Sequence, residues 1–329
     1  MLKADSLELL RSKKNLLAFS AGVDSSALFF LLLDSKIKFD IAIVNYGLRE
    51  QSEDEVSYAK ELANKYNLKC FVHNAKKVDK NFESKARDIR YSFFETIISE
   101  HGYHNLLTAH HIGDRLEWML MQLCKGAGCA ELLSMKSFEG KNNYNLIRPL
   151  LHLDKSELLT YLKSQNIKYF EDESNLDESY LRNKFRHKFS NPLISEHLEG
   201  IKKSFEYLDS DVEELIEEVK INVKDNFAYF ISSNNKRSDI YAIDKYLKSL
   251  GLMISSNERE LLKKDNSLVV GRKYVVSFYK NYVFIAPYIN EETTMTKDFK
   301  EKMRKLKIDP KLRTYFFTHL DLFESLELE

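Results

Sequence analysis

Short apolar runs alternate with longer amphipathic segments through the first 125 residues of the chain. The apolar runs are hydrophobic throughout, as expected of strands that are buried on both faces of a sheet. They lie at residues 15–19, 39–45, 69–73 and 105–109. Segments of helical length lie between them, at residues 25–34, 53–66 and 83–100. The alternation predicts an α/β fold, a Rossmann-like parallel sheet with helices on both faces.

Such sheets bind ligands beyond the carboxyl ends of their strands. The first predicted strand runs directly into Ser20-Ala21-Gly22-Val23-Asp24-Ser25, where a helix begins. Small residues let backbone N–H groups approach a phosphate closely, and the new helix offers its positive end. Asp24 could hold Mg²⁺ beside phosphates, or Asp24 or Ser25 could simply cap the helix. The spacing of these residues does not decide between the magnesium role and the capping role. The sequence contains no Walker A motif.

Composition excludes several classes of protein. Hydrophobic residues make up 43% of the chain, enough for packed cores, so wholesale disorder is excluded. The 50 basic and 50 acidic residues cancel, which argues against a polybasic binder but leaves a local basic patch open. No secretory signal is visible, and the longest apolar run, residues 27–33, is too short to span a bilayer. We therefore expect a cytoplasmic protein that does not act at a membrane.

The three cysteines indicate reduced thiols in a cytoplasm. Cys124 and Cys129 are five residues apart, which is not a C-x-x-C spacing, and Cys70 stands alone. We expect buried structural thiols rather than a metal or redox site.

The second part of the chain has a different character. Residues 193–224 are acidic and helix-prone, and two further helices are predicted at 237–250 and 257–264. Two strand-like runs between residues 274 and 285 flank Lys280-Asn281 and predict a hairpin. We place the domains at residues 1–190 and 191–329, the second being smaller and mostly helical, with a long connecting helix.

Two carboxylates follow the fourth predicted strand. His110 and His111 stand where that strand ends, and Asp114 and Glu117 share one face of the next helix. Two carboxylates at the ligand-binding edge suit an ammonium ligand. A metal site built on His-His-x-x-Asp and a solvated helix start remain alternatives.

Basic residues mark two further places. Arg87 and Arg90 lie three apart on a helix near the same edge, where guanidinium groups suit phosphates; a surface ion-pair helix is the alternative. Residues 180–188 contain no acidic residue, and their cationic side chains are Arg182, Lys184, Arg186 and Lys188. With the interleaved aromatic residues this face suits a phosphate backbone and a stacked base, unless it is a solvated helix face. Residues 297–313 form a second, weaker basic candidate for contact with a phosphate backbone.

Residues 20–25 resemble the S-G-G-x-D-S signature of the PP-loop ATP pyrophosphatases, with Ala21 in place of the first glycine. Further motifs, in matching order across residues 15–190, resemble the tRNA(Ile)-lysidine synthases. These motifs are Tyr46-Gly47-Leu48-Arg49, Ala86–Tyr91, Thr108–His111 with Asp114 and Glu117, Lys125–Gly128, Ile147–Leu151, Glu171–Asn175 and Arg182–Arg186.

The resemblance implies an ATP-dependent ligase. Its substrate would be the wobble cytidine of the CAU-anticodon isoleucine tRNA, which is adenylated at carbon 2 with release of pyrophosphate. The ε-amino group of free lysine would then displace AMP and give lysidine. The family resemblance says nothing about oligomeric state, so a homodimer remains open.

The resemblance also assigns roles to residues. It implies ATP on residues 20–25 and His110, lysine on Asp114 and Glu117, and nucleotide or base contact by Arg90. Mg²⁺ would be held by Asp24, and Asp24, Arg90 and Asp114 would be the catalytic residues. The tRNA contacts would come from the C-terminal domain and from the cationic face formed by Arg182, Lys184 and Arg186.

Several positions depart from the family pattern. Gly113 replaces an aspartate, Arg115 a glutamine and Trp118 a threonine, while Asn45 and Tyr46 replace aspartate and histidine. No acid–base role is therefore carried over to residues 45 and 46, and a second metal is in doubt. Two other functions are considered. A PP-loop tRNA thiolase would need a cysteine motif that this sequence lacks, and a nucleotide-sensing or RNA-binding module would have lost catalysis.

Overall fold

The computed structural model describes residues 1–47, 51–75, 82–141, 143–171, 180–290 and 293–326. Parts of two expected motifs, Leu48-Arg49 and residues 172–175, lie outside them. The chain divides into two compact units, Met1–Asp209 and Ser210–Glu329. The division falls later than the predicted boundary near residue 190, because the first part of a long helix packs on the first unit.

The first unit is built on a six-stranded sheet with the order β3-β2-β1-β4-β6-β5. Its strands are β1 (Asn15–Ala18), β2 (Phe39–Asn45), β3 (Cys70–Asn74), β4 (Asn105–Leu107), β5 (Phe138–Gly140) and β6 (Asn145–Ile147). Neighbouring strands are parallel except at the edge, where β5 pairs antiparallel with β6. The predicted parallel sheet is confirmed, with one antiparallel edge strand added.

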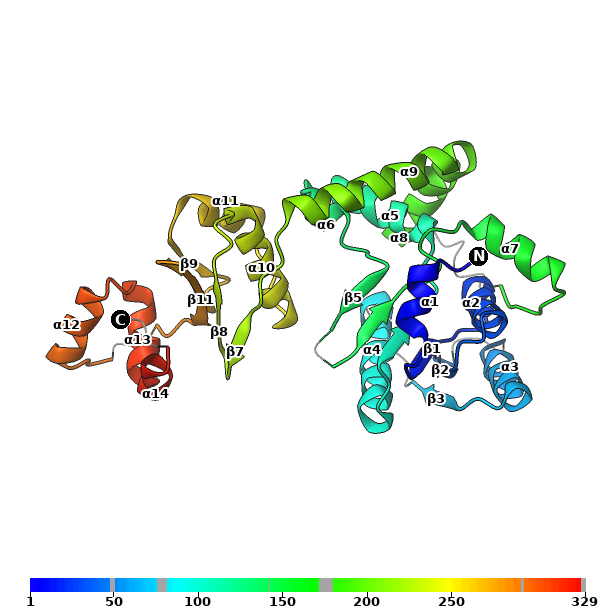
Figure 1. Cartoon of the computed structure of the whole chain (residues 1–329), viewed down its shortest axis with the longest axis horizontal. Coiled ribbons are helices and arrows are strands. Elements are labelled where there is room, and N and C mark those ends of the chain that lie inside the picture. The colour runs from blue at the N-terminus through cyan, green and yellow to red at the C-terminus, as the bar shows by residue number, and fades with distance from the viewer. Residues whose placement is uncertain (48–50, 76–81, 142, 172–179, 291–292, 327–329) are drawn as a thin grey trace. The chain divides into compact units, whose positions relative to one another are not determined.

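Helices cover both faces of this sheet (Figure 1). Successive residues of a strand point to opposite faces, so Leu17 of β1 packs with one core and Leu16 with another. The first core includes α2, α3 and α7, and the second includes α4. The helices of this unit are α1 (Ala4–Leu10), α2 (Val23–Asp34), α3 (Gln51–Tyr66), α4 (Phe82–His101), α5 (Ile112–Leu123), α6 (Cys129–Leu132), α7 (Lys155–Ser164) and α8 (Leu181–Phe185), with a π-helical turn, η2 (Arg186–Ser190).

The long helix α9 (Asn191–Leu215) begins directly after η2 and is kinked at His197. Its Phe205 is buried and lies under the guanidinium of Arg115 on α5, 4.3 Å from Cζ to the ring centroid. One turn further, Asp209 pairs with the same Arg115. These contacts bind most of α9 to the first unit, which explains the late division of the chain.

The second unit holds a five-stranded antiparallel sheet with the order β7-β8-β11-β10-β9. Its strands are β7 (Asn222–Lys224), β8 (Phe227–Ile231), β9 (Ser267–Val270), β10 (Tyr274–Tyr279) and β11 (Tyr282–Pro287). Its helices are α10 (Lys236–Ser249), α11 (Ser256–Lys264), α12 (Lys297–Lys305), α13 (Pro310–Thr318) and α14 (Leu320–Glu324). The predicted hairpin is confirmed as β10 and β11, but the sheet around it is larger than the sequence indicates. Across the described residues of both units, no helix is long and apolar enough to span a membrane.

Candidate nucleotide and lysine site

Residues 20–25 connect the carboxyl end of β1 to α2. Ala21 adopts a left-handed backbone with φ of 58°, a conformation that costs a residue with a Cβ roughly 1–2 kcal/mol. The glycine of the family motif would adopt it freely. Ala21 is fully buried, and its carbonyl accepts a hydrogen bond of 2.9 Å from the N–H of Phe170. Tertiary contact therefore holds the loop in a glycine-like shape despite the alanine.

The helix α2 begins without a side-chain cap. Its N-cap is Gly22, and no side chain accepts a hydrogen bond at this cap. The Ser25 hydroxyl instead accepts from the N–H of Ser20 at 3.2 Å and donates to the carbonyl of Gly22 at 3.2 Å. This geometry removes the capping alternative for Asp24 and Ser25. Uncapped N–H groups at a helix start are suited to an anion.

Asp24 carries a buried polar atom without a hydrogen-bond partner at the start of α2. Its Oδ1 atom is buried and has no hydrogen-bond partner in the structure. Burial raises the pKa of Asp24, and the surrounding charges that act on it belong to His111, Asp114, Lys155 and Arg186. Charged residues of the segment after β4, His111 and Asp114, therefore influence Asp24 in the phosphate loop, residues 20–25.

A magnesium ion fits the donor set at Asp24. No group of three His, Cys, Asp or Glu side chains forms a metal site within the described ranges. Mg²⁺, however, is commonly held by one or two carboxylates together with substrate phosphates. The unpartnered buried oxygen of Asp24 is the kind of donor that such an ion completes.

The two histidines after β4 are engaged locally. The Thr108 hydroxyl lies 2.9 Å from Nδ1 of His110, and burial lowers the pKa of His110 to about 3, so its ring is neutral near pH 7. His111 is the N-cap of α5 and accepts from the N–H of Gly113 at 3.1 Å. Its own N–H donates to Asp114 Oδ2 at 3.0 Å, completing a capping box. This use of both side chains favours structural roles over the metal alternative.

Gly113 is explained by the same cap. A Cβ at this position would lie 2.7 Å from Cε1 of His111. The aspartate of the family pattern would therefore require the His111 ring to move. Glycine at position 113 therefore leaves the room that the His111 ring needs to cap α5.

Four charged side chains form one ion-pair cluster at the start of α5. Asp114 Oδ1 accepts from Arg182 Nη2 at 3.1 Å and from Arg186 Nη2 at 3.0 Å. Glu117 Oε2 accepts from Arg186 Nε at 2.9 Å, and its Oε1 pairs with Arg182 Nε. Both carboxylates are buried, whereas the Arg182 and Arg186 side chains are 34% and 22% exposed. The residues expected to bind lysine and those expected to bind tRNA thus contact each other.

The pKa values of the two carboxylates in this cluster are shifted in opposite directions. Burial opposes ionisation of Asp114, but His111, Arg182 and Arg186 outweigh it and hold its pKa well below the usual range. For Glu117 burial prevails over the two arginines and raises the pKa. An incoming ammonium group would meet carboxylates that are already paired, so it would have to share or displace a guanidinium.

The comparisons with known proteins show the family to which the chain belongs. Residues 2–193 match the family model described as a PP-loop domain. A tRNA(Ile)-lysidine synthase of Wolinella succinogenes is 45% identical over 94% of each chain. The synthase of Campylobacter jejuni is 45% identical over 97% of each chain. The chain belongs to the tRNA(Ile)-lysidine synthase family.

Membership of this family makes the protein an enzyme of the ligase class and supports tRNA modification by a PP-loop ATPase. The synthase of Helicobacter pylori is 41% identical, over 94% of this chain and 91% of that one. A U34-tRNA thiolase of Methanococcus maripaludis, at 20% identity, matches 67% of this chain and 78% of its own with a TM-score of 0.54. That similarity shows a shared fold.

Arg90 is not one of the four residues of the ion-pair cluster. It is exposed on α4, close enough to lower the pKa of Tyr46, which burial raises more strongly. The Tyr46 hydroxyl donates to the carbonyl of Ala86 at 2.8 Å and so ties the end of β2 to α4. At the position of the family's histidine, this tyrosine has a structural contact. Lys184, the third residue of the expected cationic face, is exposed on α8.

Sequence reasoning gave no role to two buried arginines. Arg148 donates to the carbonyl of Lys136 at 2.7 Å and to Glu139 at 3.3 Å, and its charge contributes to the low pKa of His110. Arg115, in place of the family's glutamine, makes the contacts with α9 described above. For Arg148 the available signal was a charged residue inside the otherwise apolar stretch Leu146–Leu151, whereas Arg115 lies between Asp114 and Glu117 and gave no such signal.

The cysteines differ from expectation in one respect. All three are free, but Cys124 is exposed, and Cys70 and Cys129 are only half-buried. The expectation of buried thiols was wrong for Cys124, which stands at the exposed C-terminal end of α5. Burial raises the pKa of the Cys70 thiol, which disfavours a reactive thiolate.

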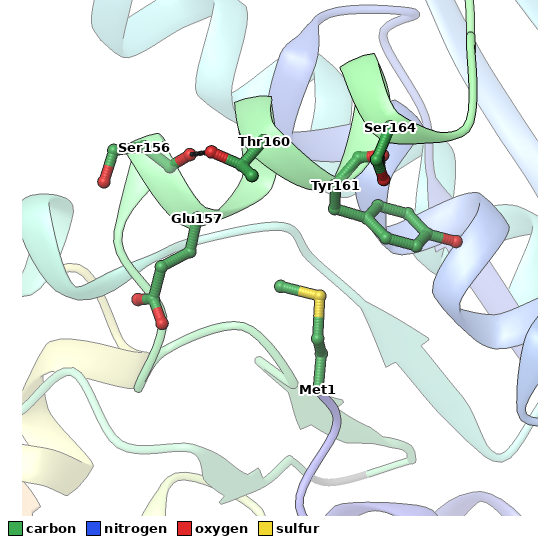
Figure 2. A pocket seen from close by; sticks show the side chains of 6 residues that line it. All are labelled: Met1, Ser156, Glu157, Thr160, Tyr161 and Ser164. Carbon is green, nitrogen blue, oxygen red and sulfur yellow. Dashed lines mark hydrogen bonds between the residues drawn. The ribbon is translucent and has the colours of Figure 1, made fainter.

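Two surface hollows lie elsewhere on the first unit. One is lined by α7 residues and Met1, as Figure 2 shows. Its Glu157 is already used, since it accepts from the N–H of Asp154 at the start of α7 and pairs with Lys202 of α9. The other is lined by α1 and the loop after it, with Phe138 and Asn145. Neither includes a residue of the predicted site.

Proposed function

We propose that this protein ligates lysine to carbon 2 of the wobble cytidine in the CAU-anticodon isoleucine tRNA. The products would be lysidine, AMP and pyrophosphate, formed through an adenylated tRNA intermediate. The observation that carries the proposal is the proximity of two parts of the site. β1 and β4 are neighbouring parallel strands, so residues 20–25 after β1 and residues 110–117 after β4 lie at the same edge of the sheet. A nucleotide and an amine held there would lie close together.

The nucleotide half of the site comprises residues 20–25 and His110. Backbone N–H groups at the uncapped start of α2 would bind the phosphates. The oxygen on carbon 2 of the cytidine attacks the α-phosphorus, and pyrophosphate leaves. Arg90, exposed on α4, would reach the nucleotide or the reacting base. Mg²⁺ held by Asp24 would offset the charge that develops on the leaving group.

The lysine half comprises Asp114 and Glu117. In the second step the neutral ε-amine attacks carbon 2, the bond to the AMP oxygen breaks, and the nitrogen loses a proton. Because its pKa is held well below the usual range, Asp114 is a poor proton acceptor. We assign it to positioning the ammonium group before the proton leaves. Arg182 or Arg186 would move aside or share the carboxylates with the substrate.

The tRNA would contact both units. Lys184 is exposed and available to phosphates, and Arg182 and Arg186, which pair with the carboxylates expected to hold lysine, are the other candidates for phosphate contact. The C-terminal unit would supply further contacts, with the basic residues 297–313 as candidates. We place the reaction in the cytoplasm, where isoleucine tRNA is used.

Transfer of radiolabelled lysine to isoleucine tRNA tests the proposal directly. We expect transfer that requires ATP and the CAU anticodon and that releases one AMP per lysine. ATP binding without any lysine transfer would instead support an RNA-binding or nucleotide-sensing module. Sulfur incorporation would support the thiolase alternative.

A further inference from the structure

The single tryptophan of the chain lies at the rim of the candidate site. Trp118 follows Glu117 on α5, and the exposed fraction changes from 1% at Glu117 to 37% at Trp118. Residues three and four apart on a helix share a side, so Asp114, Glu117 and Trp118 occupy one broad face of α5. Trp118 is therefore an exposed residue on the helix face that also carries the two buried carboxylates.

The ring is fixed at one edge. The indole N–H of Trp118 donates to the carbonyl of Glu131 on α6 at 3.3 Å. This bond satisfies the polar edge of the ring while more than a third of the residue stays open to solvent. Trp118 thus presents a flat and partly exposed aromatic surface on the helix that carries the two carboxylates.

We propose that Trp118 is a stacking platform for an anticodon-loop base next to the reacting cytidine. The inference rests on the proposed function and deepens it by naming a substrate contact. A cytidine that is attacked at carbon 2 must leave its stack, which deprives the neighbouring base of a partner. An aromatic ring at the rim replaces that partner. Lys184, which is exposed on α8, supplies positive charge that suits the adjoining phosphates.

Fluorescence of the single tryptophan tests the contact without relying on activity. The full-length protein is titrated with an anticodon stem-loop of the CAU isoleucine tRNA. The matched probe is the same stem-loop made abasic on both sides of the cytidine. We expect the intact RNA to quench Trp118 and to shield it from acrylamide, and the abasic RNA to bind without doing so. Equal quenching by both RNAs, or by neither, would overturn the stacking contact.

Kinetics of lysine transfer give a second readout. Trp118→Thr, which restores the family's residue, should raise the KM for tRNA by roughly 5- to 150-fold, the range expected when one base stack is removed. The KM for ATP should change less than about threefold, and Trp118→Phe should recover most of the loss because it keeps an aromatic face. Leu123→Ala, at an exposed position near the end of the same helix, is the control and should behave like the parent. An unchanged KM for tRNA in a folded Trp118→Thr variant would refute the proposal.

The two proposals fail in different ways. If the parent transfers lysine but the fluorescence of Trp118 does not change when the RNA binds, the stacking contact is wrong and the ligase function stands. If the intact RNA quenches Trp118 but no lysine is transferred, the ligase function is wrong and the RNA contact stands.

Discussion

Replacing Asp114 by asparagine separates the charge of the cluster from its shape. Asparagine can still accept the hydrogen bond from the His111 N–H, but it leaves two guanidinium groups facing a neutral amide. Removing one partner of a buried ion pair costs about 3–5 kcal/mol. Arg182 and Arg186 are 34% and 22% exposed, so water recovers part of this cost, and we expect a loss of about 2 kcal/mol in the free energy of unfolding.

The pH dependence of this loss has a definite sign. A carboxyl whose pKa is lowered in the folded state stabilises the protein above its unfolded pKa, about 3.9, and loses that effect as the pH falls below it. The pKa of Asp114 is lowered. Denaturant unfolding should therefore show a constant difference between parent and Asp114→Asn above about pH 5 and a shrinking difference below about pH 4.

The same variant tests the lysine assignment. A charge-assisted contact contributes about 1.5–3 kcal/mol, so the KM for lysine should rise roughly ten- to a hundred-fold while the KM for ATP changes little. Asp244→Asn is a matched control, since Asp244 is equally buried and pairs with Arg259 at 3.0 Å and Lys248 at 2.7 Å in the second unit. It should lose stability but keep the parent's KM for lysine. An unchanged KM for lysine in folded Asp114→Asn, or an equal rise in the control, would refute the reasoning.

Three other variants probe the rest of the site. Asp24→Asn should abolish pyrophosphate release while the thermal unfolding midpoint stays close to the parent's, because the loop keeps its shape and loses a charged ligand; unchanged activity and Mg²⁺ dependence would count against the metal role. Joint replacement of Arg182, Lys184 and Arg186 by alanine should reduce the log–log salt slope of tRNA binding by about 0.7–0.9 for each phosphate that the protein no longer neutralises; the same slope as the parent would remove this face from the tRNA interface. A cysteine-free variant should keep lysine transfer within a few-fold per folded molecule, since ligation needs no thiol; loss of transfer in folded protein would revive the thiolase alternative.

The strand–helix alternation was readable from sequence because its signals are local. A strand buried on both faces must be apolar throughout, and β2 was predicted with the bounds that the structure has, Phe39–Asn45. The turn at residues 20–25 was equally readable, because it was predicted to connect the first strand directly to a helix, as it does between β1 and α2. The edge strand β5 was not predicted, because Phe138–Gly140 is short and largely exposed and gains its pairing from β6.

The domain division and the ion-pair cluster depended on contacts between distant segments. Arg115 and Asp209 are 94 residues apart, and their pairing draws α9 onto the first unit. Arg182 and Glu117 are separated by 65 residues, and each motif alone looked like an open binding surface. Local patterns specify the charge of a side chain and the helix on which it lies. Only the packing of α8 and η2 against α5 decided that these charges neutralise one another, since a buried carboxylate is stable only with a partner and the nearest partner came from another part of the chain.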